Sequence, residues 1–187
     1  MSKIDEARNI LGDLRVPKKQ QSDLCCYVLL AIANLKEADS WNYATNEWIR
    51  IHDVMVFIKE NYGISYAENS RETLRKQAMH HFRNAAFIED NGKATNSPNY
   101  SYRLTHEMLE LITAYGTSEW ENKKTAFLLK HESLIEMYES KRSIIKIPVR
   151  VNGMDFSFSP GKHNQLQKAI IEEFAPRFAP DSECLYV

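Results

Sequence analysis

The chain has 187 residues, which is enough for one domain of ordinary size or for two small ones. Hydrophobic residues make up 43% and charged residues 26%, a globular composition that excludes a disordered chain, a collagen-like fibre and a disulfide-dense miniprotein. The 24 Lys and Arg nearly balance the 25 Asp and Glu, so the net charge of −1 indicates no class of binding partner.

Neither the cysteines nor the apolar segments point to the cell exterior or to a membrane. The three cysteines lack a zinc-ligand spacing, and an odd number does not make a disulfide framework. The polar N-terminus is unlike a secretory signal, and the longest apolar run, at 24–33, is about half as long as a membrane span. We expect a cytoplasmic protein that contacts no membrane.

Three helices are predicted in the first third of the chain. Ser2 is the predicted N-cap of a helix that ends before Pro17. Residues 20–35 are apolar on nearly every side, which predicts a buried central helix. Apolar side chains then recur at spacings of three and four between residues 47 and 62, and Gly63 is the predicted end of that helix.

Positive charge gathers between residues 69 and 105, where six Lys and Arg stand against three Asp and Glu. A capping box at 69–72 predicts a helix that continues to about Ala86, which we call the basic helix. The turn dipeptide at 91–92 and the polar–apolar alternation at 100–104 predict a β-hairpin after it. A helix pair followed by a hairpin is the order of a winged helix-turn-helix fold.

The basic helix has an apolar face formed by Leu74, Ala78 and Phe82, and a polar face opposite it. Lys and Arg can donate to guanine, Gln can pair with adenine, and cations near a helix N-terminus suit phosphate oxygens. The candidate DNA-binding residues are Arg71, Thr73, Arg75, Lys76, Gln77, His80 and Arg83 in the basic helix, and Lys93, Asn96 and Arg103 in the hairpin.

The same pattern has a second interpretation. A polar helix face is most often only a solvated face, and an excess of three positive charges is modest. A stand-alone winged-helix regulator, or a protein-interaction module without nuclease activity, would show a similar sequence. This alternative stays open.

The rest of the chain is predicted to alternate between helices and one hairpin. A helix is expected at 105–116, and a capping box at 118–121 predicts a long helix that reaches Arg142. Strand-like segments at 145–151 and 154–158, joined by an Asn-Gly turn, predict a second β-hairpin.

A last helix follows the second hairpin. The Ser-Pro pair at 159–160 predicts its start, and the helix is expected to end before Pro176. Its spacing predicts that Leu166, Ile170 and Phe174 face inward.

No catalytic motif is found. The six glycines fit neither a dinucleotide-binding fingerprint nor a P-loop, so no small-molecule substrate is expected. A Mg²⁺-dependent nuclease needs converging carboxylates and a nearby lysine. Glu-x-Lys occurs at 121–123 and 139–141, but both lie in a predicted helix, where residues i and i+2 point apart. We assign no catalytic and no metal-binding residue.

Six segments are similar to those of one protein family. They are NSRETLRKQ at 69–77, NSP at 96–98, GTSEWE at 116–121, SPGKHN at 159–164, AIIEEFAPRFA at 169–179 and LYV at 185–187. With these segments the chain resembles the BsuBI/PstI family of type II restriction endonucleases over nearly its whole length.

The resemblance implies a fold that is mainly α with small β. It implies a winged helix-turn-helix domain at 1–117, a long linking helix at 118–143, and the first part of an α/β nuclease domain of the PD-(D/E)xK type at 144–187. Intact members resemble homodimers that cut a palindromic DNA duplex, CTGCAG for the type members, in a Mg²⁺-dependent reaction.

The resemblance also limits what this chain does. In the family, the strand that matches 185–187 continues into the acidic metal-binding positions, and this sequence does not contain them. We therefore expect a truncated enzyme that binds double-stranded DNA, lacks the catalytic residues and binds no Mg²⁺.

Overall fold

The computed structural model describes residues 1–131, 133, 135–137, 146–159, 161–180 and 182. The chain divides into two compact units, Met1–Met137 and Tyr138–Val187. Helices dominate both units, and each unit has one small antiparallel hairpin. Within the described ranges, every helix is too short or too polar to cross a membrane.

The first unit begins with α1 (Lys3–Asp13). The Ser2 hydroxyl accepts a hydrogen bond from the Asp5 N–H at 3.4 Å, which confirms the predicted N-cap. The helix buries Ile10 and Leu11 completely, since its apolar residues recur on one side.

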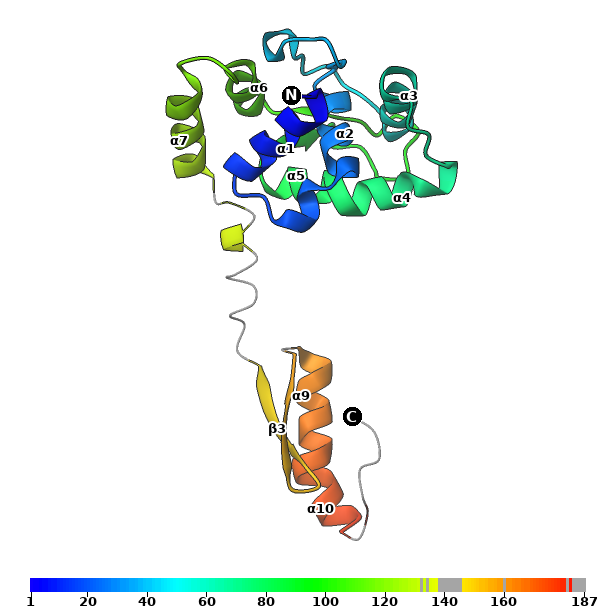
Figure 1. Ribbon diagram of the computed structural model, residues 1–187. Helices are drawn as coiled ribbons and strands as arrows, with labels where there is room; N and C mark the ends of the chain where they lie inside the picture. Colours follow the sequence, from blue (N-terminus) through cyan, green and yellow to red (C-terminus); the bar gives the residue numbers. More distant parts are fainter. Residues whose placement is uncertain (132, 134, 138–145, 160, 181, 183–187) are drawn as a thin grey trace. The chain divides into compact units, whose positions relative to one another are not determined.

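The central helix is α2 (Asp23–Ile32), which follows a 3₁₀ turn, η1 (Lys18–Gln21). Seven of its ten residues are buried, as a helix that is apolar on nearly every side requires. Helix α1 packs against it, and so do α3 (Ile51–Tyr62), the basic helix and the first hairpin (Figure 1). The core of the first unit is therefore built around α2.

Helix α3 is shorter than predicted at its N-terminal end. It begins at Ile51, whereas the sequence pattern predicted a start near Glu47. The reason is that Ile49 is extended: its N–H donates to the Tyr102 carbonyl at 2.8 Å, and the Tyr102 N–H donates back at 2.9 Å. The helix ends at Gly63 as predicted, because φ there is +73°, which suits glycine. A 3₁₀ turn, η2 (Trp41–Tyr43), precedes this region.

The basic helix runs without a break from residue 71 to residue 84. It consists of α4 (Arg71–Leu74), a π-helical turn η4 (Arg75–Met79) and α5 (His80–Asn84). The predicted capping box at 69–72 is wrong. A 3₁₀ turn, η3 (Glu68–Ser70), leads into the helix without a side-chain cap, and the Glu72 carboxylate binds cations one turn further on instead.

The first hairpin pairs β1 (Ile88–Asp90) with β2 (Tyr102–Leu104) in an antiparallel register. A loop at 91–101 joins the two strands, and the bridge from Ile49 adds a third short segment beside β2. The predicted order of helix, helix and hairpin is confirmed, since α3, the basic helix and the β1–β2 hairpin follow one another along the chain. The side chains of Tyr102 and Leu104 in β2 are buried on the core side.

Two helices complete the first unit. The side chain of Thr105 caps α6 (His106–Thr113), as a helix start at Thr105 predicts. Helix α7 (Trp120–Lys130) follows, but the predicted capping box at 118–121 does not form. Instead, the Thr117 hydroxyl accepts from the Glu119 N–H at 3.2 Å.

The prediction of one long helix to Arg142 is also wrong. Helix α7 ends at Lys130, and His131 is extended, with φ −118° and ψ 128°. A new helical turn begins after it: the Ser133 N–H donates to the Glu136 carboxylate at 2.9 Å, and the Glu136 N–H donates to the Ser133 hydroxyl at 3.3 Å. This reciprocal capping box starts a separate helical turn at residues 135–137. Residues 138–145 lie outside the described residues.

The second unit contains the predicted second hairpin, β3 (Ile147–Val151) and β4 (Met154–Phe158). Asn152 and Gly153 both have positive φ, +47° and +81°, which is the turn that an Asn-Gly pair favours. The hairpin buries Val149 and Val151 on one side. The strand expected at 185–187 from the family resemblance lies outside the described residues.

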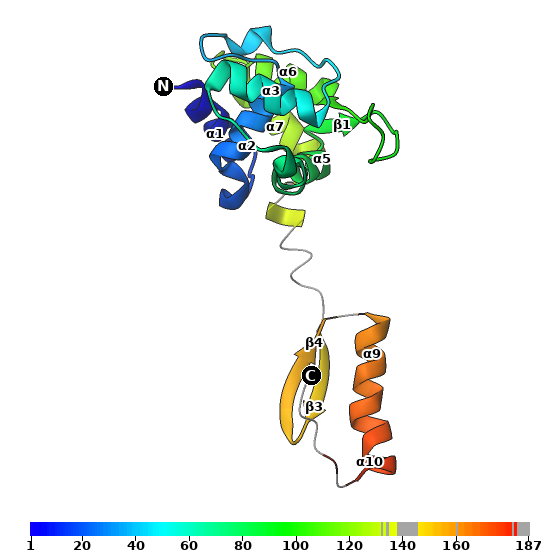
Figure 2. The ribbon, with the colours of Figure 1, turned by 90° about the vertical axis from the view of Figure 1, so that its right-hand side faces the viewer.

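One helical run lies along this hairpin (Figure 2). It comprises α9 (Lys162–Ala169), a π-helical turn η5 (Ile170–Phe174) and α10 (Ala175–Phe178). The N-cap is Gly161 rather than Ser159, and Pro160 lies outside the described residues. The run passes through Pro176 instead of ending before it. The π-helical turn ends at Phe174, so Pro176 lies in the first turn of α10, where a residue without a backbone N–H is tolerated.

The apolar stripe of this helical run does not face inward. Leu166, Ile170 and Phe174 keep 59%, 47% and 57% of their surface exposed, which contradicts the prediction from spacing. Within the described second unit, only the two-stranded hairpin flanks the run, and a hairpin covers one side of a helix at most. Periodicity thus identified the stripe correctly but not its burial.

Candidate nucleic-acid interface

The two faces of the basic helix have opposite environments. Leu74, Ala78 and Phe82 are completely buried, as predicted. Phe82 packs against Phe87 with ring centroids 5.8 Å apart, which fixes the C-terminal end of the helix on the core. The polar face therefore stands on a rigid support.

The predicted polar face is solvent-exposed along its whole length. Its exposed members are Arg71, Thr73, Lys76, Gln77, His80 and Arg83, with Arg75 half-buried at the edge. No apolar side chain interrupts this set, because every apolar residue of the helix points to the core. Such a face can donate and accept hydrogen bonds over about four helical turns.

Glu72 holds two of the candidate cations. Its carboxylate accepts from both Nε and a terminal nitrogen of Arg75, at 2.7 and 2.6 Å, and lies 3.3 Å from the Lys76 Nζ. The hydrogen bonds from Arg75 lower the pKa of Glu72 to about 2, despite the opposing effect of desolvation. With its pKa lowered in this way, the Glu72 carboxyl is ionised at every physiological pH.

The other candidate arginines also have acidic partners. Arg71 pairs with Glu68, and the Arg71 guanidinium lies 3.1 Å from Nδ1 of His52. In the hairpin region the Arg83–Asp90 pair measures 3.0 Å. Counting charges alone therefore overstated the positive character of this region.

The hairpin differs in how its two basic candidates are held. Arg103 is paired with Glu89 at 2.7 Å. Lys93 makes no ion pair within the described part of the chain. It stands in the exposed loop with Asn96, as predicted, and is the freest cation of the candidate set.

A hollow separates the start of the basic helix from the hairpin loop, and we call it the helix–loop hollow. Its lining residues are Arg50, Ile51, His52, Arg71, Glu72, Arg75, Thr95, Asn96, Ser97, Pro98, Tyr100 and Tyr102. Three arginines line this hollow, and each of them has an acidic partner: Arg50 pairs with Asp53, Arg71 with Glu68 and Arg75 with Glu72. An anion that enters the hollow must therefore exchange with one of these carboxylates.

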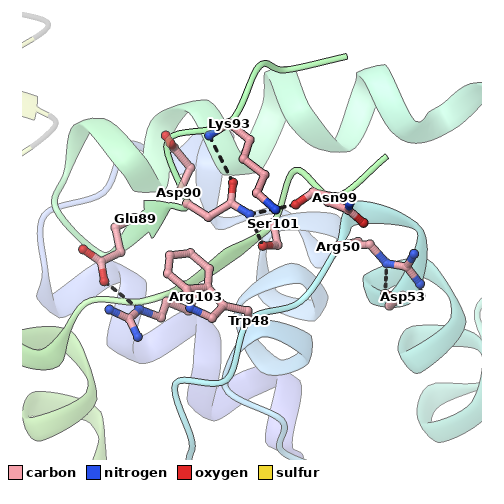
Figure 3. A pocket seen from close by; sticks show the side chains of 10 residues that line it. Trp48, Arg50, Asp53, Glu89, Asp90, Lys93, Asn99, Ser101 and Arg103 are labelled. Atoms are coloured by element: carbon pink, nitrogen blue, oxygen red, sulfur yellow. Dashed lines mark hydrogen bonds and ion pairs between the residues drawn. The ribbon is translucent and has the colours of Figure 1, made fainter. Parts of the chain in front are cut away.

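A second hollow lies on the other side of the hairpin (Figure 3), and we call it the Trp48 hollow. Glu89 and Arg103 line one end of it, and Arg50 and Asp53 the other. Three acids and three cations line it: Asp53, Glu89 and Asp90, and Arg50, Lys93 and Arg103.

The hairpin loop is held by Asn91. Its side-chain nitrogen donates to the Asn99 carbonyl at 2.7 Å and to the Ser101 hydroxyl at 2.8 Å, and its side-chain oxygen accepts from the Lys93 N–H at 3.3 Å (Figure 3). The side-chain amide of Asn91 thus connects the two sides of the loop and holds the backbone of Lys93 in place.

Comparison with known families assigns both units. Residues 1–136 match the family described as the BsuBI/PstI restriction endonuclease HTH domain, and residues 145–187 match the BsuBI/PstI restriction endonuclease domain. The chain belongs to the BsuBI/PstI restriction endonuclease family. This confirms the family resemblance seen in the sequence.

Individual relatives agree with the family assignment. The chain is 39% identical to the type II restriction enzyme BsuBI of Bacillus subtilis over 99% of its own length and 60% of that enzyme. It is 28% identical to the type II restriction enzyme AplI of Arthrospira platensis, over 97% of the chain and 57% of that enzyme.

A solved structure shares the fold. The SdaI restriction endonuclease matches with a TM-score of 0.67 and 32% identity, over 98% of this chain and 59% of that chain. The chain therefore spans about three fifths of the length of the restriction enzymes it resembles.

Three residues that lie beside the candidate nucleic-acid interface of this BsuBI/PstI family member were not identified from the sequence. Arg50 lines both hollows, His52 contacts Arg71, and Trp48 packs under Arg103. No sequence signal pointed to Arg50, because the predicted helix began near Glu47 and only the structure places Arg50 just before α3. Nothing in the sequence indicated the positions of Trp48 and His52. Trp48 depends on the hairpin packing against the segment before α3, and His52 on the basic helix packing against α3.

The described residues contain no cluster of three acidic, histidine or cysteine side chains that fits a metal ion. Glu121 pairs with Lys124, and Lys123 pairs with Glu119, so the Glu-x-Lys at 121–123 does not converge, as predicted. The second Glu-x-Lys, at 139–141, lies outside the described residues.

Proposed function

We propose that residues 1–117 bind double-stranded DNA as a winged helix-turn-helix domain of a type II restriction endonuclease. The observation that carries the proposal is the polar face of the basic helix, exposed over its whole length while the opposite face is completely buried. Helix α3 is the supporting helix, and the loop at 91–101 is the wing. The match to a helix-turn-helix family supports this reading.

In this arrangement the basic helix enters the major groove. Lys76, Gln77 and Thr73 lie toward the base edges, where Lys can donate to guanine and Gln can pair with adenine. Arg71 and Arg75 border the helix–loop hollow, and their guanidinium groups suit a backbone phosphate passing between the helix and the wing. Lys93 and Asn96 in the loop reach the next part of the backbone.

We further propose that residues 118–143 link this domain to a PD-(D/E)xK nuclease domain, of which 144–187 are the first part. The proposed whole enzyme is a homodimer that cleaves a palindromic site with Mg²⁺. The described residues of this chain do not fit the metal, since no three His, Cys, Asp or Glu side chains gather there, and Glu172 accepts from the Arg150 N–H at 2.8 Å and pairs with Lys168. The matched enzymes are longer than this chain, and we propose that the catalytic carboxylates lie in the part of such an enzyme that this chain does not match.

Fluorescence anisotropy with labelled duplexes at two salt concentrations tests the proposal. One duplex carries CTGCAG, the palindrome that the family resemblance implies, and a scrambled duplex is the control. Binding that prefers the palindrome and weakens with salt supports base reading by the basic helix, because each phosphate contact adds about 0.9 to the salt slope. Equal binding to both duplexes supports a backbone clamp. Absence of binding at low salt overturns the proposal in favour of a protein-interaction module.

A further inference from the structure

Glu72 is the only acidic residue in the basic helix, and it stands among the cations proposed to contact DNA. Its side chain is 50% exposed, and those of Arg75 and Lys76 are 44% and 71% exposed. Exposed ion pairs contribute little to folding stability, so the fold does not account for this arrangement.

The geometry of the pair resembles that of a phosphate contact. Arg75 gives Glu72 two parallel hydrogen bonds, at 2.7 and 2.6 Å, which is the fork that a guanidinium also offers to phosphate oxygens. Lys76 approaches the same carboxylate. Two cations are thus satisfied within the protein before any DNA arrives.

We propose that Glu72 competes with DNA phosphates for Arg75 and Lys76, and so restrains non-specific binding to the duplex backbone. This inference rests on the proposed DNA-binding function. A phosphate must displace the carboxylate to engage Arg75, and the released carboxylate then faces the negatively charged duplex. Binding that gains only phosphate contacts is therefore weakened more than binding that also gains base contacts.

The test is Glu72→Gln, which keeps the size of the side chain and one acceptor oxygen, removes the negative charge and replaces the second acceptor with an NH2 donor. Anisotropy is measured with a scrambled duplex between about 50 and 200 mM salt. The variant is expected to bind about three- to ten-fold more tightly at the lower salt, since each exposed pair costs a few-fold to break. Its salt slope is expected to steepen by about 1 to 2, because Arg75 becomes available to phosphates, and so does Lys76, which has no preferred base to contact in the scrambled duplex.

Glu121→Gln is the matched control. Glu121 is 72% exposed and pairs with Lys124 one turn along α7, at 2.8 Å, so this change removes the same charge and a similar pair outside the basic helix. It is expected to leave binding to the scrambled duplex unchanged. An equal increase in affinity for the scrambled duplex in both variants would mean that binding depends only on the net charge of the protein, and the inference would be wrong.

Other outcomes are equally decisive. If the parent chain binds the scrambled duplex and Glu72→Gln, shown to be folded by circular dichroism, binds it no more tightly, the inference fails and the proposed function stands. If neither protein binds any duplex at low salt, the proposed function fails and the inference with it.

Discussion

The guanidinium group of Arg103 lies over the indole ring of Trp48, 4.4 Å from the ring centroid. The same guanidinium donates from Nε to Glu89 at 2.7 Å. Next to this contact, Ile49 exchanges backbone hydrogen bonds with Tyr102. The hairpin is therefore attached to the segment just before α3 by both side-chain and backbone contacts, and the two parts of the proposed interface are held together.

Trp48→Ala is expected to lower the free energy of unfolding by about 1 kcal/mol, because the cation–π contact is lost at a partly exposed site. Urea unfolding followed by circular dichroism measures this. Trp48→Phe keeps an aromatic face and is expected to lose less. Equal stability of the alanine variant and the parent would show that the contact does not hold the hairpin.

Asn91→Ala is expected to loosen the hairpin loop, because its three hydrogen bonds to Lys93, Asn99 and Ser101 disappear together. Hydrogen exchange at the backbone amides of the loop should become faster, with little change elsewhere. Asn96→Ala is the control, since its side chain is exposed in the same loop. Unchanged exchange in the Asn91 variant would contradict the clamp.

Lys76→Ala and Arg75→Ala are expected to have different effects on DNA binding. If Lys76 contacts a base, its loss costs about 1–3 kcal/mol and relaxes the preference at one position of the site. If Arg75 contacts a phosphate, its loss weakens binding to every duplex and reduces the salt slope by about 1. Anisotropy with preferred and scrambled duplexes separates the two patterns. Parent-like binding by both variants would contradict the assignment of the basic helix.

The Glu72 pair is expected to stabilise the fold only above acidic pH. The pKa of Glu72 is lowered from its usual 4.5 to about 2, so its contribution is fully present above about pH 4.5 and is lost as the pH falls toward 2. Melting temperatures of the parent and of Glu72→Gln should therefore differ by a constant amount near neutral pH. The difference should shrink to zero toward pH 2, and a difference that persists there would contradict the shift.

Much of the first unit was predictable because its signals are local. The Ser2 cap, the uniformly apolar segment that becomes α2, and the Gly63 helix end each depend on a few neighbouring residues. The buried face of the basic helix followed from its periodicity, since Leu74 and Phe82 recur at helical spacing.

The errors share one cause, which is competition from contacts distant in sequence or from a nearby alternative partner. Helix α3 starts late because Ile49 pairs with Tyr102, 53 positions along the chain. Glu72 does not cap its helix because Arg75 and Lys76 bind its carboxylate instead. The helix after Trp120 stops at Lys130, since a second capping box at 133–136 starts a new turn.

The sequence by itself determined the family, the order of helices and hairpins, and which face of the basic helix is polar, since motifs and periodicity are local properties of a chain. Only the tertiary structure decided how that polar face is charged. The pairing of Arg83 with Asp90 and of Arg103 with Glu89 depends on strands β1 and β2 folding against the basic helix and each other. The number of charged residues can be read from the sequence, but which opposite charges lie within ion-pair distance of one another is decided only when the chain folds.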